Sequence, residues 1–307
     1  MTPGRPRPPG RVTAGRPKPL GVGATLAVVA PSSSFEPEGL EAGLSWLRQR
    51  YRVVHAPDIL QRQGYFAGDD GRRIRELREA LDDPGVDAIL AARGGYGATR
   101  ILPAITPERV RAAAKPIVGF SDITALHALW ARAGVGSLHA PMAVALGSAS
   151  PEERQAFIAA LEGQPLSAWT GLSCVVPGRA RGRLLGGNLA VLCALLGTPQ
   201  MPSLEGAVLL LEDVGERPYR VDRMLTSLLQ SGSLEGVRAL LLGHFTQAAA
   251  GVDGVSVEAV LAERLGTLGV PVLSGVPAGH GSPNLSLPLG AEVSVDAGAG
   301  KLRFEEG

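Results

Sequence analysis

Residues 115–127 read KPIVGFSDITALH and change from a strand pattern to a helix pattern at one serine. The run 117–120 is short and apolar, as expected of a buried strand, whereas apolar residues recur at helical spacing from Ile123 onward. Ser121 therefore stands on a strand-to-helix turn, which in an open α/β sheet lies where ligands bind. A serine on such a turn either presents a nucleophilic hydroxyl beside a backbone N–H or serves only as the N-cap of the helix.

Strand and helix patterns alternate on both sides of this turn. Strand-like runs occupy residues 26–30, 51–55, 86–91, 117–120 and 137–139, and helix patterns cover 38–50, 74–81, 99–102 and 151–161. This alternation predicts a parallel sheet with helices on both faces. After a break at 163–173, interpreted as a linker, strand-like runs at 207–211, 239–243 and 270–274 alternate with helical runs at 189–196, 221–229 and 257–265. Residues 292–304 alternate as a closing hairpin does.

The composition is that of an ordinary globular chain, long enough for two domains. Of the 307 residues 45% are hydrophobic and 19% charged, and the net charge of +1 gives no electrostatic case for nucleic acid. Cys174 and Cys193 form neither a disulfide framework nor a metal-ligand spacing, which favours a reducing compartment.

The N-terminal residues differ from the rest of the chain. Residues 1–19 are rich in proline, glycine and arginine and are predicted to be a disordered basic tail. The apolar residues that follow, 20–30, resemble the core of a signal peptide. We interpret 26–30 as the first buried strand instead, because the segment is short and broken by Gly21 and Gly23. No later segment approaches transmembrane length.

A glycine-rich loop, RGGYG at residues 93–97, follows the third predicted strand. Its glycines allow backbone N–H groups to approach a ligand closely. Neither a Walker sequence nor a GxGxxG sequence is present, so the loop matches no standard phosphate-binding motif. The loop is either an oxyanion-donor loop, as in serine hydrolases, or a tight turn.

Two further positions could complete a catalytic set. Glu212 and Asp213 follow five apolar residues, and a carboxylate buried there needs a partner, which is either a nearby arginine or a catalytic group. His280 lies between two glycines on a loop after a strand, where catalytic residues are often placed. The order serine, acid, histidine also occurs in α/β-hydrolases, but the turn around Ser121 lacks their second glycine, which indicates another scaffold. Structural roles are expected for His127, His139 and His244.

Six stretches, taken in order, closely resemble the LD-carboxypeptidase family of serine peptidases, which includes muramoyl-tetrapeptide carboxypeptidases and microcin C self-immunity hydrolases. They are AVVAPSS (27–33), RGGYG (93–97), GFSDITALH (119–127), GGNL (186–189), LEDVGERPYRVDRML (211–225) and GHGSPNLSLPLG (279–290). The resemblance runs from about residue 20 to the C-terminus. It implies an N-terminal flavodoxin-like parallel-sheet domain at 20–165 and a smaller C-terminal α/β domain at 174–307, with the active site at their interface.

Carried over by position, the family's nucleophile falls on Ser121, its acid on Glu212 and its base on His280. The oxyanion donors fall on the backbone N–H groups of Gly95 and Asp122. The residues expected to bind substrate are Arg93, Tyr96, Asn188 and Arg220, and neither a metal nor a cofactor is implied.

The resemblance implies a cytoplasmic homodimer that releases the terminal D-alanine of a murein tetrapeptide during peptidoglycan recycling, with no nucleic acid or membrane partner. A microcin-type hydrolase of aminoacyl-nucleotide conjugates is the first alternative. It is disfavoured because few aromatic residues, Trp130, Phe157 and Trp169, lie between the serine and the acid. The second alternative is a non-catalytic binder of peptidoglycan fragments, against which the presence of all three catalytic residue types argues.

Overall fold

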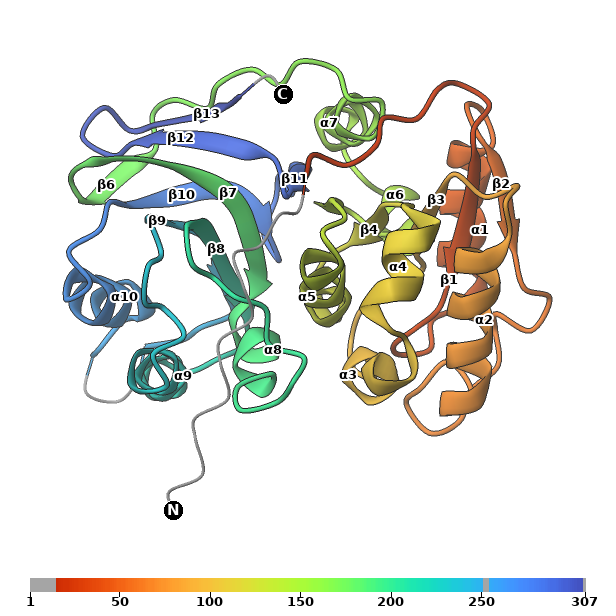
Figure 1. Cartoon of the computed structure of the whole chain (residues 1–307), viewed down its shortest axis with the longest axis horizontal. Helices are drawn as coiled ribbons and strands as arrows, with labels where there is room; N and C mark the ends of the chain where they lie inside the picture. The colour runs from red at the N-terminus through yellow and green to blue at the C-terminus, as the bar shows by residue number, and fades with distance from the viewer. Residues whose placement is uncertain (1–14, 251–253, 306–307) are drawn as a thin grey trace.

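The computed structural model describes residues 15–250 and 254–305, which form two lobes, each built around its own sheet (Figure 1). Residues 1–14 of the predicted disordered tail lie outside the described residues. Residues 15–19 contact the first lobe, because the Arg16 guanidinium donates to the carbonyl oxygens of Gly163 and Gln164 at 3.4 and 3.2 Å. The predicted tail therefore extends too far at its C-terminal end.

The sheet of the first lobe has the strand order β2-β1-β3-β4-β5-β11. Strands β1 to β5 are parallel, and β11 pairs antiparallel with β5. The order 2-1-3-4-5 is that of flavodoxin-like folds, as predicted. The bounds are β1 Thr25–Val29, β2 Arg52–His55, β3 Ala88–Ala91, β4 Ile117–Gly119, β5 Ser137–His139 and β11 Leu287–Leu289. The edge strand β11 comes from the C-terminal part of the chain and was not predicted.

Helices cover both faces of this sheet, and each face has its own hydrophobic core. One core includes buried side chains of α2 (Asp70–Asp82), α4 (Pro107–Ala113) and α5 (Thr124–Ala133). The other includes side chains of α1 (Pro37–Leu47), α6 (Ala143–Leu146) and α7 (Pro151–Leu161). The short helix α3 (Ala98–Ile101) follows β3, and 3-10 turns occupy Leu102–Ala104 and Ser121–Ile123.

The sheet of the second lobe has the strand order β13-β12-β7-β8-β9-β10-β6. This lobe also has two hydrophobic cores. Its central strands β7 to β10 are parallel, and the flanking strands are antiparallel. The strand bounds are β6 Ser173–Val176, β7 Arg179–Asn188, β8 Ala207–Val214, β9 Ala239–Thr246, β10 Val272–Gly279, β12 Glu292–Asp296 and β13 Lys301–Phe304. The helices are α8 Leu189–Ala194, α9 Pro218–Gln230 and α10 Val257–Gly266.

The second lobe departs from the sequence prediction at β6 and β7, which were not expected. The predicted hairpin is confirmed as β12 and β13. Strand β8 ends one residue after Asp213, so that Glu212 and Asp213, predicted at the tip of this strand, lie within it. Within the described ranges, no helix is long and apolar enough to cross a membrane.

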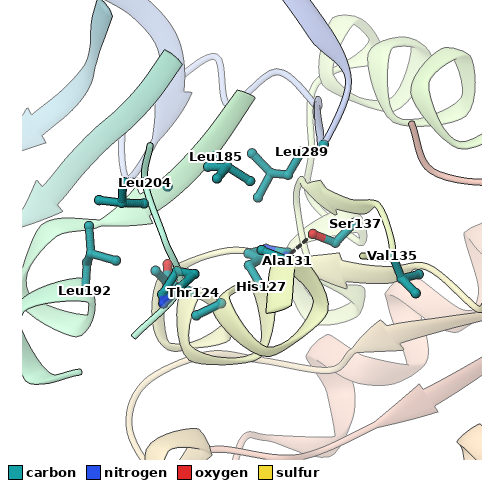
Figure 2. A pocket seen from close by; sticks show the side chains of 13 residues that line it. Thr124, His127, Ala131, Val135, Ser137, Leu185, Leu192, Leu204 and Leu289 are labelled. Atoms are coloured by element: carbon teal, nitrogen blue, oxygen red, sulfur yellow. Dashed lines mark hydrogen bonds between the residues drawn. The ribbon is translucent and has the colours of Figure 1, made fainter. Parts of the chain in front are cut away.

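The two lobes meet where α5 of the first packs against β7 and α8 of the second (Figure 1). A cavity of about 20 Å³ remains between them, with room for about one water molecule (Figure 2). His127 and Ala131 of α5 line one side, and Leu185 and Leu192 line the other. The helix that follows Ser121 is therefore closely packed between the lobes.

Candidate active site

Ser121 occupies a strained turn at the end of β4. Its φ angle is +63°, in the left-handed region that residues other than glycine rarely adopt. Such conformations cost of order 1–3 kcal/mol and occur preferentially at functional sites. The N-cap alternative for Ser121 is wrong. The caps of the 3-10 turn and of α5 are Phe120 and Ile123, and neither cap uses a side-chain hydrogen bond.

The glycine-rich loop after β3 lies directly against this turn. A Cβ atom on Gly94 would be 2.9 Å from the Cβ of Ser121 and 3.0 Å from its Oγ, so only glycine allows this approach. Ser33 holds the loop, since its N–H donates to the Gly94 carbonyl at 3.2 Å and its hydroxyl accepts from the Tyr96 N–H at 3.0 Å. Within the described residues, the N–H groups of Gly95 and Asp122 have no hydrogen-bond acceptor. Both remain available to an oxyanion.

The side chain of Asp122 holds the turn in place through hydrogen bonds. It is buried, and its Oδ2 atom accepts from the Ser32 hydroxyl at 2.6 Å and from the Ala98 N–H at 2.8 Å. One carboxylate thus joins the loop after β1 and the first turn of α3 to the residue that follows Ser121. Burial is the main cause that raises the pKa of Asp122. Only the backbone N–H of Asp122 was predicted to take part in the site, and no local pattern in the sequence indicates these side-chain contacts.

Glu212, in β8, contacts His280 rather than an arginine. Its fully buried side chain accepts at Oε2 from His280 Nδ1–H at 2.7 Å and from the His280 backbone N–H at 3.2 Å. Gly279 makes this contact possible, because a Cβ there would lie 2.5 Å from Oε2. Since the carboxylate can only accept, Nδ1 of His280 carries a proton and Nε2 is the nitrogen left to act as a base.

The neighbouring carboxylate, Asp213, has a different role. Its Oδ1 accepts from the Asn188 side-chain amide at 3.2 Å, and its Oδ2 accepts from the Ala190 N–H at 2.9 Å. The amide oxygen of Asn188 in turn caps α8 by accepting from the Val191 N–H at 3.0 Å. Asn188 is buried and hydrogen-bonded at both ends of its amide, and its contact with substrate remains a prediction.

His280 lies beside the turn that carries the serine. Its imidazole packs against the ring of Phe120, the residue before Ser121, with centroids 4.9 Å apart, and 19% of its side chain is exposed. Within the described residues no hydrogen bond joins Ser121 Oγ to His280. In enzymes without bound substrate such bonds are often long and tighten only in the substrate complex. The structure therefore shows the acid–histidine contact and places the serine turn next to it.

The other candidate histidines support the site. His127 donates from Nε2 to the Gly119 carbonyl at 2.9 Å and accepts the Ser137 hydroxyl at Nδ1, also at 2.9 Å. Burial lowers the pKa of His127 to about 4 and that of His139 to about 3, so both are neutral at pH 7. His244 donates to the Pro283 carbonyl at 3.1 Å and so steadies the loop that carries His280. The hydrogen bonds of His127 and His244 are of the structural kind that was expected, and the ring of His139 packs against that of Phe120, with centroids 5.7 Å apart.

Three predicted substrate-binding residues are exposed at the edges of the site. Arg93 donates to the Ser34 carbonyl, and Tyr96, in the glycine-rich loop, is 47% exposed. Arg220 lies in the first turn of α9, where its guanidinium is 3.6 Å from the Glu216 carboxylate. Their contact with substrate remains a prediction.

Comparison with known proteins gives the family of the chain. The model of the LD-carboxypeptidase N-terminal domain matches residues 26–140, and that of the LD-carboxypeptidase C-terminal domain matches residues 181–295. The chain belongs to the LD-carboxypeptidase family. A putative carboxypeptidase of Streptomyces coelicolor is 44% identical, over 94% of this chain and 96% of the relative.

Two further members of the LD-carboxypeptidase family have more specific names. The murein tetrapeptide carboxypeptidase of Pseudomonas aeruginosa is 33% identical, over 88% of this chain and 92% of its own. The crystal structure of muramoyltetrapeptide carboxypeptidase from Oxalobacter formigenes superposes with a TM-score of 0.82 at 31% identity, covering 92% of this chain and 98% of that one.

This LD-carboxypeptidase has a positioning contact that the sequence analysis missed. Glu153 of α7, in the first lobe, accepts at Oε1 from the Asn284 N–H at 2.8 Å. The Asn284 side chain accepts from the Gly279 N–H at 2.9 Å. One carboxylate of the first lobe thus fixes the loop of the second lobe that carries His280. The capping-box spacing from Ser150 to Glu153 was present in the sequence, but a cap alone does not indicate a contact 131 residues away.

Replacing Glu153 by alanine should lower kcat about tenfold with little change in KM, because small displacements of a catalytic group are costly. The matched control is Ser150→Ala, which removes the cap of α7 but leaves the Asn284 contact. We expect it to cost about 1 kcal/mol of unfolding free energy and to preserve kcat. Steady-state kinetics and thermal unfolding of both variants test this, and an equal loss of kcat in the two would contradict the positioning role.

Proposed function

We propose that this protein is a serine LD-carboxypeptidase that releases the terminal D-alanine of a murein tetrapeptide, free or attached to its muramoyl sugar. The observation that carries the proposal is the hydrogen bond from His280 Nδ1 to the buried Glu212, beside the left-handed Ser121 and its glycine-rich loop. Carboxypeptidase relatives that share almost the whole chain support the reaction class. The substrate and the role of each residue are proposals.

In the first half of the proposed reaction, His280 Nε2 takes the proton of Ser121 Oγ as this oxygen attacks the scissile carbonyl. Glu212 keeps the imidazole oriented and stabilises its positive charge. The free N–H groups of Gly95 and Asp122 donate to the oxyanion, which is usually the largest electrostatic contribution. His280 then returns the proton to the leaving amine, and D-alanine departs.

In the second half, water attacks the ester that now joins Ser121 to the shortened peptide. His280 accepts a proton from that water and passes it to Ser121 Oγ when the ester bond breaks. The product is a tripeptide with a new free carboxylate, and the enzyme is restored. An exopeptidase must also recognise the terminal carboxylate of its substrate, for which the guanidinium groups of Arg93 and Arg220 are suited.

The microcin-type alternative finds less support. Of the aromatic side chains between the serine and the acid, Trp130 and Phe157 are fully buried. Trp169 packs edge-on against Phe304, with ring centroids 5.3 Å apart. Trp169 is thus the one aromatic ring of this described segment that is partly exposed. We further propose that the enzyme works in peptidoglycan recycling as a cytoplasmic homodimer, which gel filtration and cell fractionation can test.

The deciding experiment incubates the purified full chain with a murein tetrapeptide and measures free D-alanine by chiral chromatography. The same peptide with a C-terminal amide is the control, since the proposed recognition needs a free carboxylate. An aspartyl-sulfamoyl-adenosine conjugate is assayed in parallel. We expect release of D-alanine from the tetrapeptide with a free C-terminal carboxylate and none from its C-terminal amide. Cleavage of the conjugate alone would favour the microcin-type function, and tight binding without product would favour a non-catalytic binder.

A further inference from the structure

Three aromatic residues form an exposed cluster beside the glycine-rich loop, which we name the aromatic shelf: Tyr65, Phe66 and Tyr96. The ring centroids of Tyr65 and Phe66 are 4.3 Å apart, and Tyr96 lies 6.0 and 5.7 Å from them. Tyr65 is 60% exposed and Tyr96 47%. Large apolar rings gathered at a surface commonly mark a binding site.

The shelf is held rigidly by arginines. The guanidinium groups of Arg73 and Arg100 lie 4.6 and 4.8 Å from the centroid of the Phe66 ring. Arg73 is fully buried and donates to the Pro31 carbonyl at 2.7 Å. Both arginines pair with the carboxylate of Asp70, which holds their guanidinium groups in place beside the ring. A surface fixed in this way loses little conformational entropy when it binds a ligand.

The aromatic shelf is connected by short stretches of chain to the turn that carries Ser121. Tyr96 comes two residues after Gly94, which touches Ser121, and Ser33 holds the Tyr96 N–H. The next residue along, Ser34, donates from its N–H to the Tyr65 carbonyl at 3.1 Å. A substrate whose scissile bond lies at Ser121 would therefore have one of its ends near these rings.

We propose that the aromatic shelf binds the muramoyl sugar of a sugar-linked tetrapeptide; this rests on the proposed function. In such a substrate the sugar lies three amino acids before the scissile bond, about 10 Å along an extended chain. The rings offer apolar faces to the C–H groups of the sugar, and the two tyrosine hydroxyls can hydrogen-bond its N-acetyl group.

The arrangement of the rings favours a sugar over a nucleobase. The rings are inclined to one another by 37° to 50°, so they form no parallel-walled slot for a flat base. A puckered sugar ring can lie across such tilted faces.

The test compares kcat/KM for muramoyl-tetrapeptide and for free tetrapeptide in the wild type and in three variants. We expect the wild type to prefer the sugar-linked substrate about tenfold, and Tyr65→Ala to lose that preference through KM. Tyr65→Phe should keep most of it, because the ring remains. The control is Tyr219→Ala, another exposed tyrosine beside arginines but on α9 of the second lobe, and it should keep the ratio.

Calorimetry gives a readout that does not depend on turnover. In the Ser121→Ala background, adding Tyr65→Ala should weaken binding of muramoyl-tetrapeptide about tenfold and leave free tetrapeptide unaffected. Equal cleavage of both substrates by the wild type, or an unchanged ratio in Tyr65→Ala, would overturn the shelf proposal while leaving the proposed function intact. The shelf proposal would also be overturned if Tyr65→Ala weakened the binding of adenosine monophosphate while the muramoyl sugar had no effect on substrate binding. Failure to release D-alanine from either substrate would refute the proposed function itself.

Discussion

Replacing Ser121 by alanine is expected to lower kcat for D-alanine release by about ten-thousand-fold or more. The substitution removes the oxygen that attacks the scissile carbonyl, and no other hydroxyl occupies the left-handed turn at the end of β4. The Gly95 and Asp122 N–H groups and the His280–Glu212 pair remain, so the residual rate reflects binding and oxyanion stabilisation alone. Single-turnover measurements with tetrapeptide give the rate, and calorimetry confirms that substrate still binds.

A second substitution separates the effect of losing the hydroxyl from the effect of the strained backbone. Ser121→Gly also removes the hydroxyl, but glycine adopts a φ of +63° without penalty. We expect this variant to be as inactive as Ser121→Ala and more stable than it by about 1 kcal/mol in denaturant unfolding. Near-normal turnover in either variant would show that Ser121 is not the nucleophile.

Replacing Glu212 by glutamine should lower kcat by about a hundred-fold to ten-thousand-fold. The neutral amide is nearly the same size as the carboxylate, so it can be accommodated in the space beside Gly279. It removes the negative charge that stabilises the imidazolium, and its NH2 group can reverse which nitrogen of His280 carries the proton. The loss should appear in kcat, because the change affects the proton transfer and not peptide binding.

Glu216→Gln is the matched control, because this carboxylate lies four residues along the chain from Glu212 and faces Arg220 instead of a histidine. It should retain wild-type kcat. NMR adds a second measure, since the Nδ1 proton that His280 shares with Glu212 should give a strongly downfield signal that disappears in Glu212→Gln alone. Equal loss of activity in the two glutamine variants, or unchanged activity in Glu212→Gln, would contradict the assignment of the acid.

Local patterns in the sequence were sufficient to predict the five parallel strands of the first lobe, but not α4, α6 or the edge strand β11. Strands β1, β3 and β4 are short apolar runs, and the strand predicted at 137–139 coincides with β5. The turn at Ser121 was predictable because the spacing of the apolar residues changes there from that of a strand to that of a helix. The close approach of Gly94 to this left-handed serine was not predictable, because it joins two segments that are distant in the sequence.

The second lobe shows where local patterns are insufficient. Strand β7 was missed because Arg179, Arg181 and Arg183 alternate with small residues, so few apolar side chains mark it. Strand β11 has three residues and is a strand only through its pairing with β5, almost 150 residues earlier in the chain. The Asp122–Ser32 and Glu153–Asn284 hydrogen bonds also join distant segments, and no local spacing indicates them.

The origin of β11 has a consequence for the synthesis of the protein. The outer strand of the sheet that carries Ser121 is translated after His280. Until then, β5 has an open edge on the ribosome. Under the proposed mechanism a growing chain is therefore inactive until His280 has been added, and a fragment that ends before residue 280 has the proposed nucleophile without its proposed base.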